Sequence, residues 1–122
     1  MKTWYPLLIL AAPLILSAGC ASHPDPIKIP KNAAEMTVAF SWEGIDPCTH
    51  DSPEIRVSPV PKGTAELQVK LKDISMPEWN HGGGKVKHDG SGVIPAGALK
   101  IGYNGPCQPG GRHPYEFSVM AV

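Results

Sequence analysis

A two-residue alternation of apolar and polar positions runs through much of residues 35–122. It is clearest in residues 64–72, where every second residue from Ala65 to Leu71 is apolar and the residues between them are polar. The same period recurs in residues 35–43 and 115–122, and a period of two predicts half-buried β-strands. The apolar positions of these two segments are Met36, Val38, Phe40, Trp42, Tyr115, Phe117, Val119 and Ala121.

Weaker patterns predict two more strands. Residues 98–103 place Leu99, Ile101 and Tyr103 on one face, and residues 54–60 form a short strand in which Pro59 marks either an edge strand or a strand end. Residues 73–89 are expected to be a loop that holds a triple glycine, and residues 90–97 are rich in turn residues. Proline or glycine interrupts each segment that has a helical period. The predicted fold class is therefore all-β, an antiparallel β-sandwich with little helix.

The composition limits the chain to one modest domain. Its 122 residues are 42% hydrophobic, with 11 basic and 11 acidic side chains. This length supports a single core. The balanced charge argues against nucleic acid as a partner, because phosphate backbones require a basic surface.

The first 34 residues are expected to lie outside the folded domain. Lys2 precedes an apolar run that ends in small residues, which predicts a signal peptide over residues 1–19. Residues 16–20 resemble the lipobox of bacterial lipoproteins, which implies that Cys20 carries lipid and that residues 20–34 form a proline-rich tether. By resemblance to Gram-negative lipoproteins, Ala21 in place of an aspartate after the cysteine favours the outer membrane, facing the periplasm. The alternative is an ordinary signal peptide with an incidental cysteine.

Two cysteines remain if Cys20 is lipidated. In an oxidising compartment, Cys48 and Cys107 would most often pair, across a sequence separation of 59 residues. The alternative is two reduced, buried thiols.

The most constrained stretch is residues 104–117, in which glycines and prolines surround Cys107 and lead to His113 and Tyr115. Glycine and proline prescribe the backbone, and such a loop suits an anion. The alternative for this stretch is a stiff hairpin connection. Asp73 and His81 follow the best strand. Because loops converge at one end of a sandwich, these polar groups are expected to share a pocket. Both histidines would donate to a phosphate or carboxylate, with Asp73 orienting one imidazole.

At these residues the chain resembles the phosphatidylethanolamine-binding protein family, which includes the Raf kinase inhibitor proteins. Asp73, Pro77 four residues later and then His81 are similar to the first family signature. Residues 105–110, followed by His113 and Tyr115, are similar to the second. Three positions depart from the family pattern: Ser75 replaces a second Asp, Gly82 replaces a Trp, and Pro114 replaces an Arg, although Arg112 is nearby.

The resemblance implies a domain over residues 35–122 that binds phosphate-bearing head groups such as phosphoethanolamine without catalysis, without a cofactor and without a metal. It implies the ligand-binding residues Asp73, Pro77, His81, Gly105, Pro106, His113 and Tyr115. The expected partners are a small anionic ligand or a phospholipid head group, and the membrane through the N-terminal lipid.

Three alternatives compete with this interpretation. A hydrolase would need a nucleophile such as Ser75 or Ser91, but there is no G-x-S-x-G motif. A metal site from Cys48, His50, Cys107 and His113 lacks close ligand spacing. An interaction or inhibitor module of the cell envelope is the third, although no residue pattern identifies a protein partner.

Overall fold

The computed structural model describes residues 30–107 and 111–122. The predicted signal peptide, the lipidation site Cys20 and most of the predicted tether lie outside the described residues. Within them the fold is all-β and contains no helix, so none of these residues forms an apolar helix long enough to cross a membrane.

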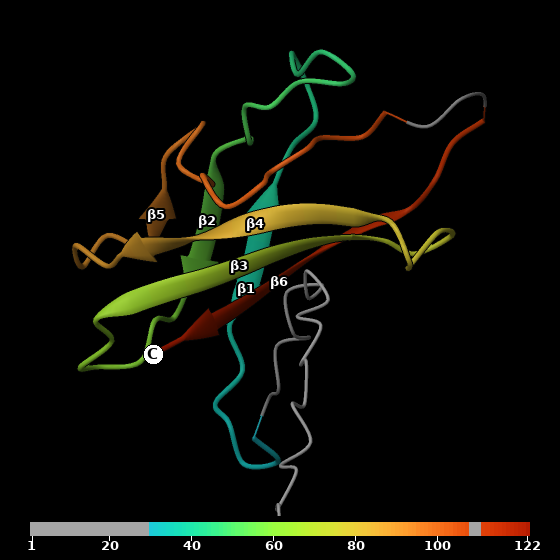
Figure 1. Cartoon of the computed structure of the whole chain (residues 1–122). Helices are drawn as coiled ribbons and strands as arrows, with labels where there is room; N and C mark the ends of the chain where they lie inside the picture. Colours follow the sequence, from blue (N-terminus) through green and yellow to red (C-terminus); the bar gives the residue numbers. More distant parts are fainter. Residues whose placement is uncertain (1–29, 108–110) are drawn as a thin grey trace, which may run out of the picture.

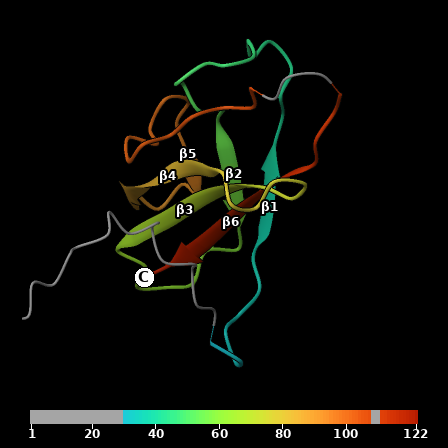
Figure 2. The same ribbon diagram turned by 45° about the vertical axis from the view of Figure 1, so that its right-hand side comes forward.

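Six strands form two antiparallel sheets. The first sheet has the order β1-β2-β5 and the second has the order β4-β3-β6 (Figure 1). The strands are β1 (Thr37–Phe40), β2 (Ile55–Ser58), β3 (Glu66–Asp73), β4 (Asn80–Lys87), β5 (Val93–Ile94) and β6 (Tyr115–Ala121). In both views the strands of one sheet run across those of the other (Figures 1 and 2).

Both sheets contribute to one apolar core. Its buried members are Ile55, Val57, Leu67, Val69, Leu71, Ile94, Leu99, Tyr103 and Phe117. The ring of Phe40 in β1 packs edge-on against the ring of Phe117 in β6, with centroids 4.7 Å apart. Such aromatic pairs stabilise by about 0.5–1.5 kcal/mol beyond their buried area. The core therefore ties the first sheet to the second through side chains and not through strand pairing.

The strongest sequence pattern is confirmed with shifted bounds: the strand predicted over residues 64–72 spans Glu66–Asp73, and Ala65, its first expected apolar position, lies outside the strand and is exposed. β3 buries Leu67, Val69 and Leu71 and is the central strand of its sheet, pairing with β4 and with β6. Asp73, the last residue of β3, is paired with Tyr115, the first residue of β6. This register brings the two ends of the predicted site together.

The prediction for residues 73–89 is wrong in its second half, because β4 is a full strand that contains the triple glycine. Asn80 and Gly83 of β4 pair with two residues of β3 that have only Leu71 between them. Two residues separate Asn80 from Gly83, so the register shifts there. This is a β-bulge, with Gly82 at φ 66°. A bulge re-aims the neighbouring side chain, and here His81 is buried.

The strand predicted for residues 98–103 is also wrong. This segment runs antiparallel beside the glycines of β4 and makes a single isolated bridge, between Gly83 and Ile101. Leu99 and Tyr103 are buried as expected, but the side chain of Ile101 is 53% exposed. The glycines of β4 allow this segment to approach closely: a Cβ on Gly84 would lie 2.8 Å from the Cα of Leu99.

The strand that contains residues 54–60 is shorter than predicted. It ends at Ser58, before the cis peptide bond between Ser58 and Pro59, so Pro59 does mark a strand end. The alternative position at a sheet edge is wrong, because β2 lies between β1 and β5.

Tyr103 buries its hydroxyl without a hydrogen-bond partner among the described residues. Burial raises the pKa of Tyr103 to about 12. In the unfolded chain this tyrosine titrates near pH 10.0, so between about pH 10 and 12 the unfolded state releases its proton while the folded state keeps it. The free energy of unfolding therefore falls over this range. Removing an unsatisfied buried polar group usually costs nothing or stabilises.

We therefore expect Tyr103→Phe to raise the free energy of unfolding by about 1 kcal/mol at neutral pH and to flatten its decline above pH 10. Urea denaturation across this pH range measures both effects. A loss of stability in the variant at neutral pH would show that the hydroxyl makes a stabilising contact.

Candidate functional site

Asp73 organises the site from the end of β3. Its side chain is fully buried, and its Oδ1 accepts hydrogen bonds from the backbone amides of Ser75 at 2.9 Å and Met76 at 3.1 Å. An aspartate that bonds the backbone two and three residues ahead forms a local turn. This turn ends β3 and leaves Oδ2 for a second partner.

That partner is His113. Its Nδ1 donates to Oδ2 of Asp73 across 2.7 Å, and its side chain is 22% exposed. Burial by itself raises the pKa of Asp73, but the hydrogen bond from His113, the two backbone amides and the charge of His113 together hold the pKa below its ordinary value. The carboxylate fixes the ring orientation, so Nε2 is the nitrogen of His113 that is left for a ligand.

Tyr115 extends the same network. Its hydroxyl hydrogen-bonds to Asp73, and it accepts a hydrogen bond from the backbone amide of Cys107. Burial, then the charge of Asp73 and the hydrogen bond to it, raise the pKa of Tyr115, while the Cys107 amide opposes the shift. The hydroxyl therefore stays protonated at neutral pH and joins Asp73 to the segment that precedes β6.

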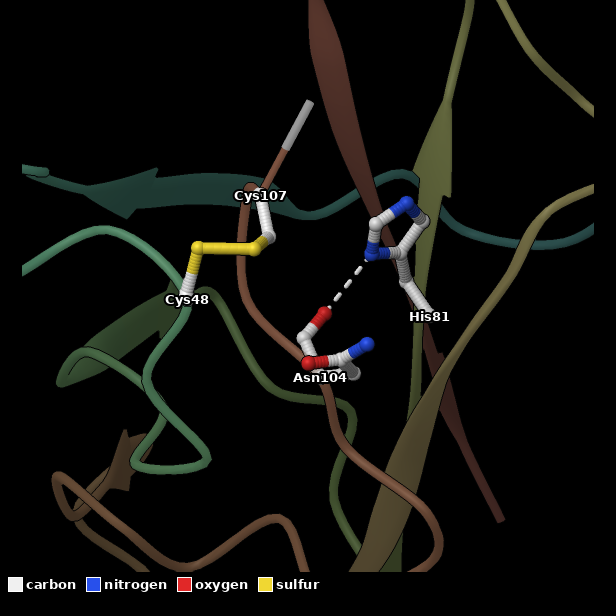
Figure 3. The surroundings of a disulfide bond; sticks show 4 residues. All are labelled: Cys48, His81, Asn104 and Cys107. Carbon is white, nitrogen blue, oxygen red and sulfur yellow. Dashed lines mark hydrogen bonds between the residues drawn. A yellow bond between two sulfur atoms is a disulfide. The ribbon is translucent and has the colours of Figure 1, made fainter. Parts of the chain in front are cut away.

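His81 lies behind Tyr115. The two rings meet edge to face, with centroids 5.3 Å apart. Nδ1 of His81 is 2.7 Å from the carbonyl oxygen of Asn104 and points toward it (Figure 3). A carbonyl accepts only, so Nδ1 carries the proton. The other nitrogen, Nε2, is buried without a partner among the described residues.

A cavity of about 250 Å³ opens in front of this network. One wall follows β1 and the other comes from the segments that precede β6. The lining residues are Trp42, Ile45, Asp46, Pro47, Pro106, Arg112, His113 and Tyr115. The cavity is thus apolar on much of its wall, with Arg112, His113, Asp46 and Tyr115 as its charged or titratable groups.

The predicted disulfide is confirmed. Cys48 and Cys107 are bonded, with their Cα atoms 4.4 Å apart. Two backbone hydrogen bonds flank it: the Cys48 amide donates to the Pro106 carbonyl at 2.8 Å, and the Gly105 amide donates to the Thr49 carbonyl at 2.9 Å. The bond joins the loop after β1 to the segment before β6 (Figure 3).

The predicted site residues fall into three positions. Pro106, His113 and Tyr115 line the cavity, while Asp73 and His81 lie behind them and contact them. Gly105 is buried beside the disulfide, where a Cβ would lie 2.9 Å from the Thr49 carbonyl oxygen. Pro77 is exposed in the turn between β3 and β4 and does not line this cavity, so its role in binding stays a prediction.

The sequence interpretation missed one wall. Ile45, Asp46 and Pro47 follow β1 in a stretch without a binding motif, and only the adjacent Cys48 signalled that this loop reaches the second signature. Trp42, an apolar position of the strand predicted over residues 35–43, packs against Phe117 with ring centroids 5.7 Å apart and also lines the cavity. Arg112, noted for its nearness to His113, also lines it.

The cysteines are not available for the metal site considered above, because they are bonded to each other. Across residues 30–107 and 111–122, no group of three or more His, Cys, Asp or Glu side chains is placed to hold a metal ion. No protein-family model, curated protein or solved structure matches this chain.

Proposed function

We propose that this chain is a domain of the phosphatidylethanolamine-binding type, with its two sheets forming that family's sandwich. It binds small phosphate-bearing or other anionic ligands of the phospholipid head-group type in the cavity beside His113. The observation that carries the proposal is the Asp73–His113 pair at the wall of a cavity that also contains Arg112.

The chemistry of these groups favours an anion. A ring that carries protons on both nitrogens donates from Nδ1 to Asp73 and from Nε2 to a ligand oxygen at once. Arg112 offers a planar guanidinium that suits phosphate or carboxylate, and the described residues give it no ion pair.

The cavity also suits a head group that carries an ammonium. Asp46 lines the same cavity as Arg112, and it too has no ion pair among the described residues. The ring of Trp42 lies in the same cavity, and aromatic faces attract cations. Phosphoethanolamine has both charges, whereas inorganic phosphate would meet only repulsion from Asp46.

Binding without catalysis is part of the proposal. Among the described residues, the cavity lining includes no serine, threonine or free cysteine to act as a nucleophile. Ser91, the alternative nucleophile, lies in an exposed turn, where its hydroxyl donates to Oδ1 of Asp89. The lipid anchor at Cys20 and the outer-membrane location rest on the sequence alone, and the disulfide is consistent with an oxidising compartment.

A histidine titration tests the proposal. With the full chain, phosphoethanolamine is expected to shift the ring signals of His81 and His113 in NMR spectra and to leave those of His50 and His88 unchanged. His113→Gln can still donate to Asp73 but lacks the second ring nitrogen. Loss of a hydrogen bond to a charged ligand costs about 1.5–3 kcal/mol, so its affinity is expected to fall about 10- to 100-fold.

His88→Gln is the matched control, because the Nδ1 of His88 pairs with the Thr64 carbonyl far along the sheet from the cavity. Its affinity is expected to equal that of the wild type. Equal affinity in His113→Gln would remove His113 from the site. Absence of any shift with the wild type would remove the proposed function and favour an interaction module of the envelope.

A further inference from the structure

The disulfide sits at the junction of the two walls of the cavity. Pro47 is a lining residue of the first wall and is followed directly by Cys48. Pro106 is a lining residue of the second wall and is followed directly by Cys107. The disulfide therefore joins the two cavity walls at the residue that follows a lining residue on each side.

The disulfide is also continuous with the polar network behind the cavity. The backbone amide of Cys107 donates to the hydroxyl of Tyr115, which in turn hydrogen-bonds to Asp73. Asp73 accepts from His113. A displacement of Cys107 thus reaches the ligand-facing ring of His113 through two intervening side chains, and Tyr115 and His113 are themselves lining residues.

Two observations indicate that the contact between these two segments is sensitive to reduction of the disulfide. Cys48 has φ 63°, in the left-handed region that a non-glycine residue seldom adopts. Both cysteines are exposed, so a reductant can reach them. Without the bond, the chain at Cys48 is free to leave the left-handed region, and the flanking hydrogen bonds between residues 48–49 and 105–106 lose the constraint that holds them.

We propose that the Cys48–Cys107 disulfide is a positioning element of the ligand site, so that the oxidised chain binds its anion and the reduced chain binds it weakly. This inference rests on the proposed function. A dithiol reductant supplies two electrons and two protons: one of its thiolates attacks a cysteine sulfur, the mixed disulfide is resolved by its second thiol, and Cys48 and Cys107 leave as thiols while the reductant becomes a cyclic disulfide.

The test compares ligand affinity in the two redox states of the full chain. Phosphoethanolamine and inorganic phosphate are titrated before and after reduction with dithiothreitol, and far-UV circular dichroism and amide chemical-shift dispersion follow the fold. We expect affinity for phosphoethanolamine to fall about tenfold or more while the fold is retained, as when groups that support a binding residue are lost. Equal affinity in the two states would overturn the inference.

A second variant decides the question if the reduced chain unfolds. Tyr115→Phe keeps the disulfide and the aromatic ring but removes the hydroxyl that joins the Cys107 amide to Asp73. We expect it to bind phosphoethanolamine several-fold more weakly and to shift the His113 ring signals. Its matched control is Tyr103→Phe, which removes a buried hydroxyl without a partner among the described residues and is expected to leave affinity unchanged. Equal affinity in both tyrosine variants would contradict the proposed route.

The failure of this inference differs from the failure of the proposed function. If the oxidised wild type binds neither probe, the proposed function fails. The positioning role then still predicts that reduction, with circular dichroism unchanged, shifts the ring signals of His113 and Tyr115. If those signals do not move, the disulfide is a staple of the fold alone.

Discussion

Gly83→Ala is expected to lower the free energy of unfolding by about 3 kcal/mol, near the upper end of the usual cost of overpacking. A Cβ at this position would collide with the backbone carbonyl of Val69 in the neighbouring strand. Backbone atoms cannot rotate away as a flexible side chain can. The amide and carbonyl of Gly83 also exchange two hydrogen bonds of 3.0 Å with Ile101, so a shift of the strand weakens its contact with the segment that carries Ile101.

Urea denaturation of Gly83→Ala and of Gly63→Ala separates this clash from ordinary glycine effects. Gly63 has φ 87° with nothing near its Cβ position, so its substitution is expected to cost only the left-handed backbone penalty of about 1–2 kcal/mol. Equal losses in the two variants would show that β4 moves freely away from β3. Because His81 lies in the adjoining bulge, Gly83→Ala is also expected to weaken ligand binding.

Asp73→Asn is expected to weaken anion binding about tenfold and to remove much of the acid dependence of stability. The amide of asparagine presents N–H groups where the carboxylate accepts from Nδ1 of His113, so the ring loses its fixed orientation. The backbone amides of Ser75 and Met76 still find an acceptor in the asparagine oxygen, so the turn that ends β3 is expected to persist.

The sign of the pH effect follows from the lowered pKa of Asp73. Below the unfolded value of 3.8, the unfolded chain binds the proton before the folded chain does. The stabilisation by Asp73 is therefore complete above pH 3.8 and is lost as pH falls from there through the lower folded pKa. Denaturation of the wild type should show this decline, and Asp73→Asn should lack it.

Asp89→Asn is the matched control for this prediction. Hydrogen bonds from Ser91 lower the pKa of Asp89 as well, but Asp89 lies in an exposed turn away from the cavity. It should alter acid stability without altering affinity. If Asp73→Asn and Asp89→Asn had the same affinity as the wild type, the carboxylate of Asp73 would have no part in holding the ligand-binding ring.

Part of the site was predictable because it depends on strand ends and on local turns. The alternation that ends at Asp73 and the one that begins at Tyr115 identify two strand ends, and these strands pair in antiparallel register. Asp73 and His113 therefore come together as expected. The pairing of Cys48 with Cys107 was the more probable of two alternatives and is confirmed.

The strand β4 was not predictable from its own residues. Three consecutive glycines have no side chains to alternate, so a periodicity argument assigns them to a loop. What makes them a strand is the need for close backbone approach on two sides, to Val69 in β3 and to the segment that carries Leu99 and Gly102. His81 was accordingly predicted in a loop, whereas it lies in the strand beside a bulge.

The residues alone were enough to predict the all-β class and the two strand ends that carry Asp73 and Tyr115, because alternation and turn chemistry are local properties. The cysteine pair followed from the count of cysteines in an oxidising compartment. Which loop faces His113 depends instead on the packing of the whole domain. Asp46 and Arg112 lie 66 residues apart in the chain and share a cavity because the core and the disulfide bring their segments together. This proximity depends on how the two sheets pack, and no short-range pattern along the chain predicts it.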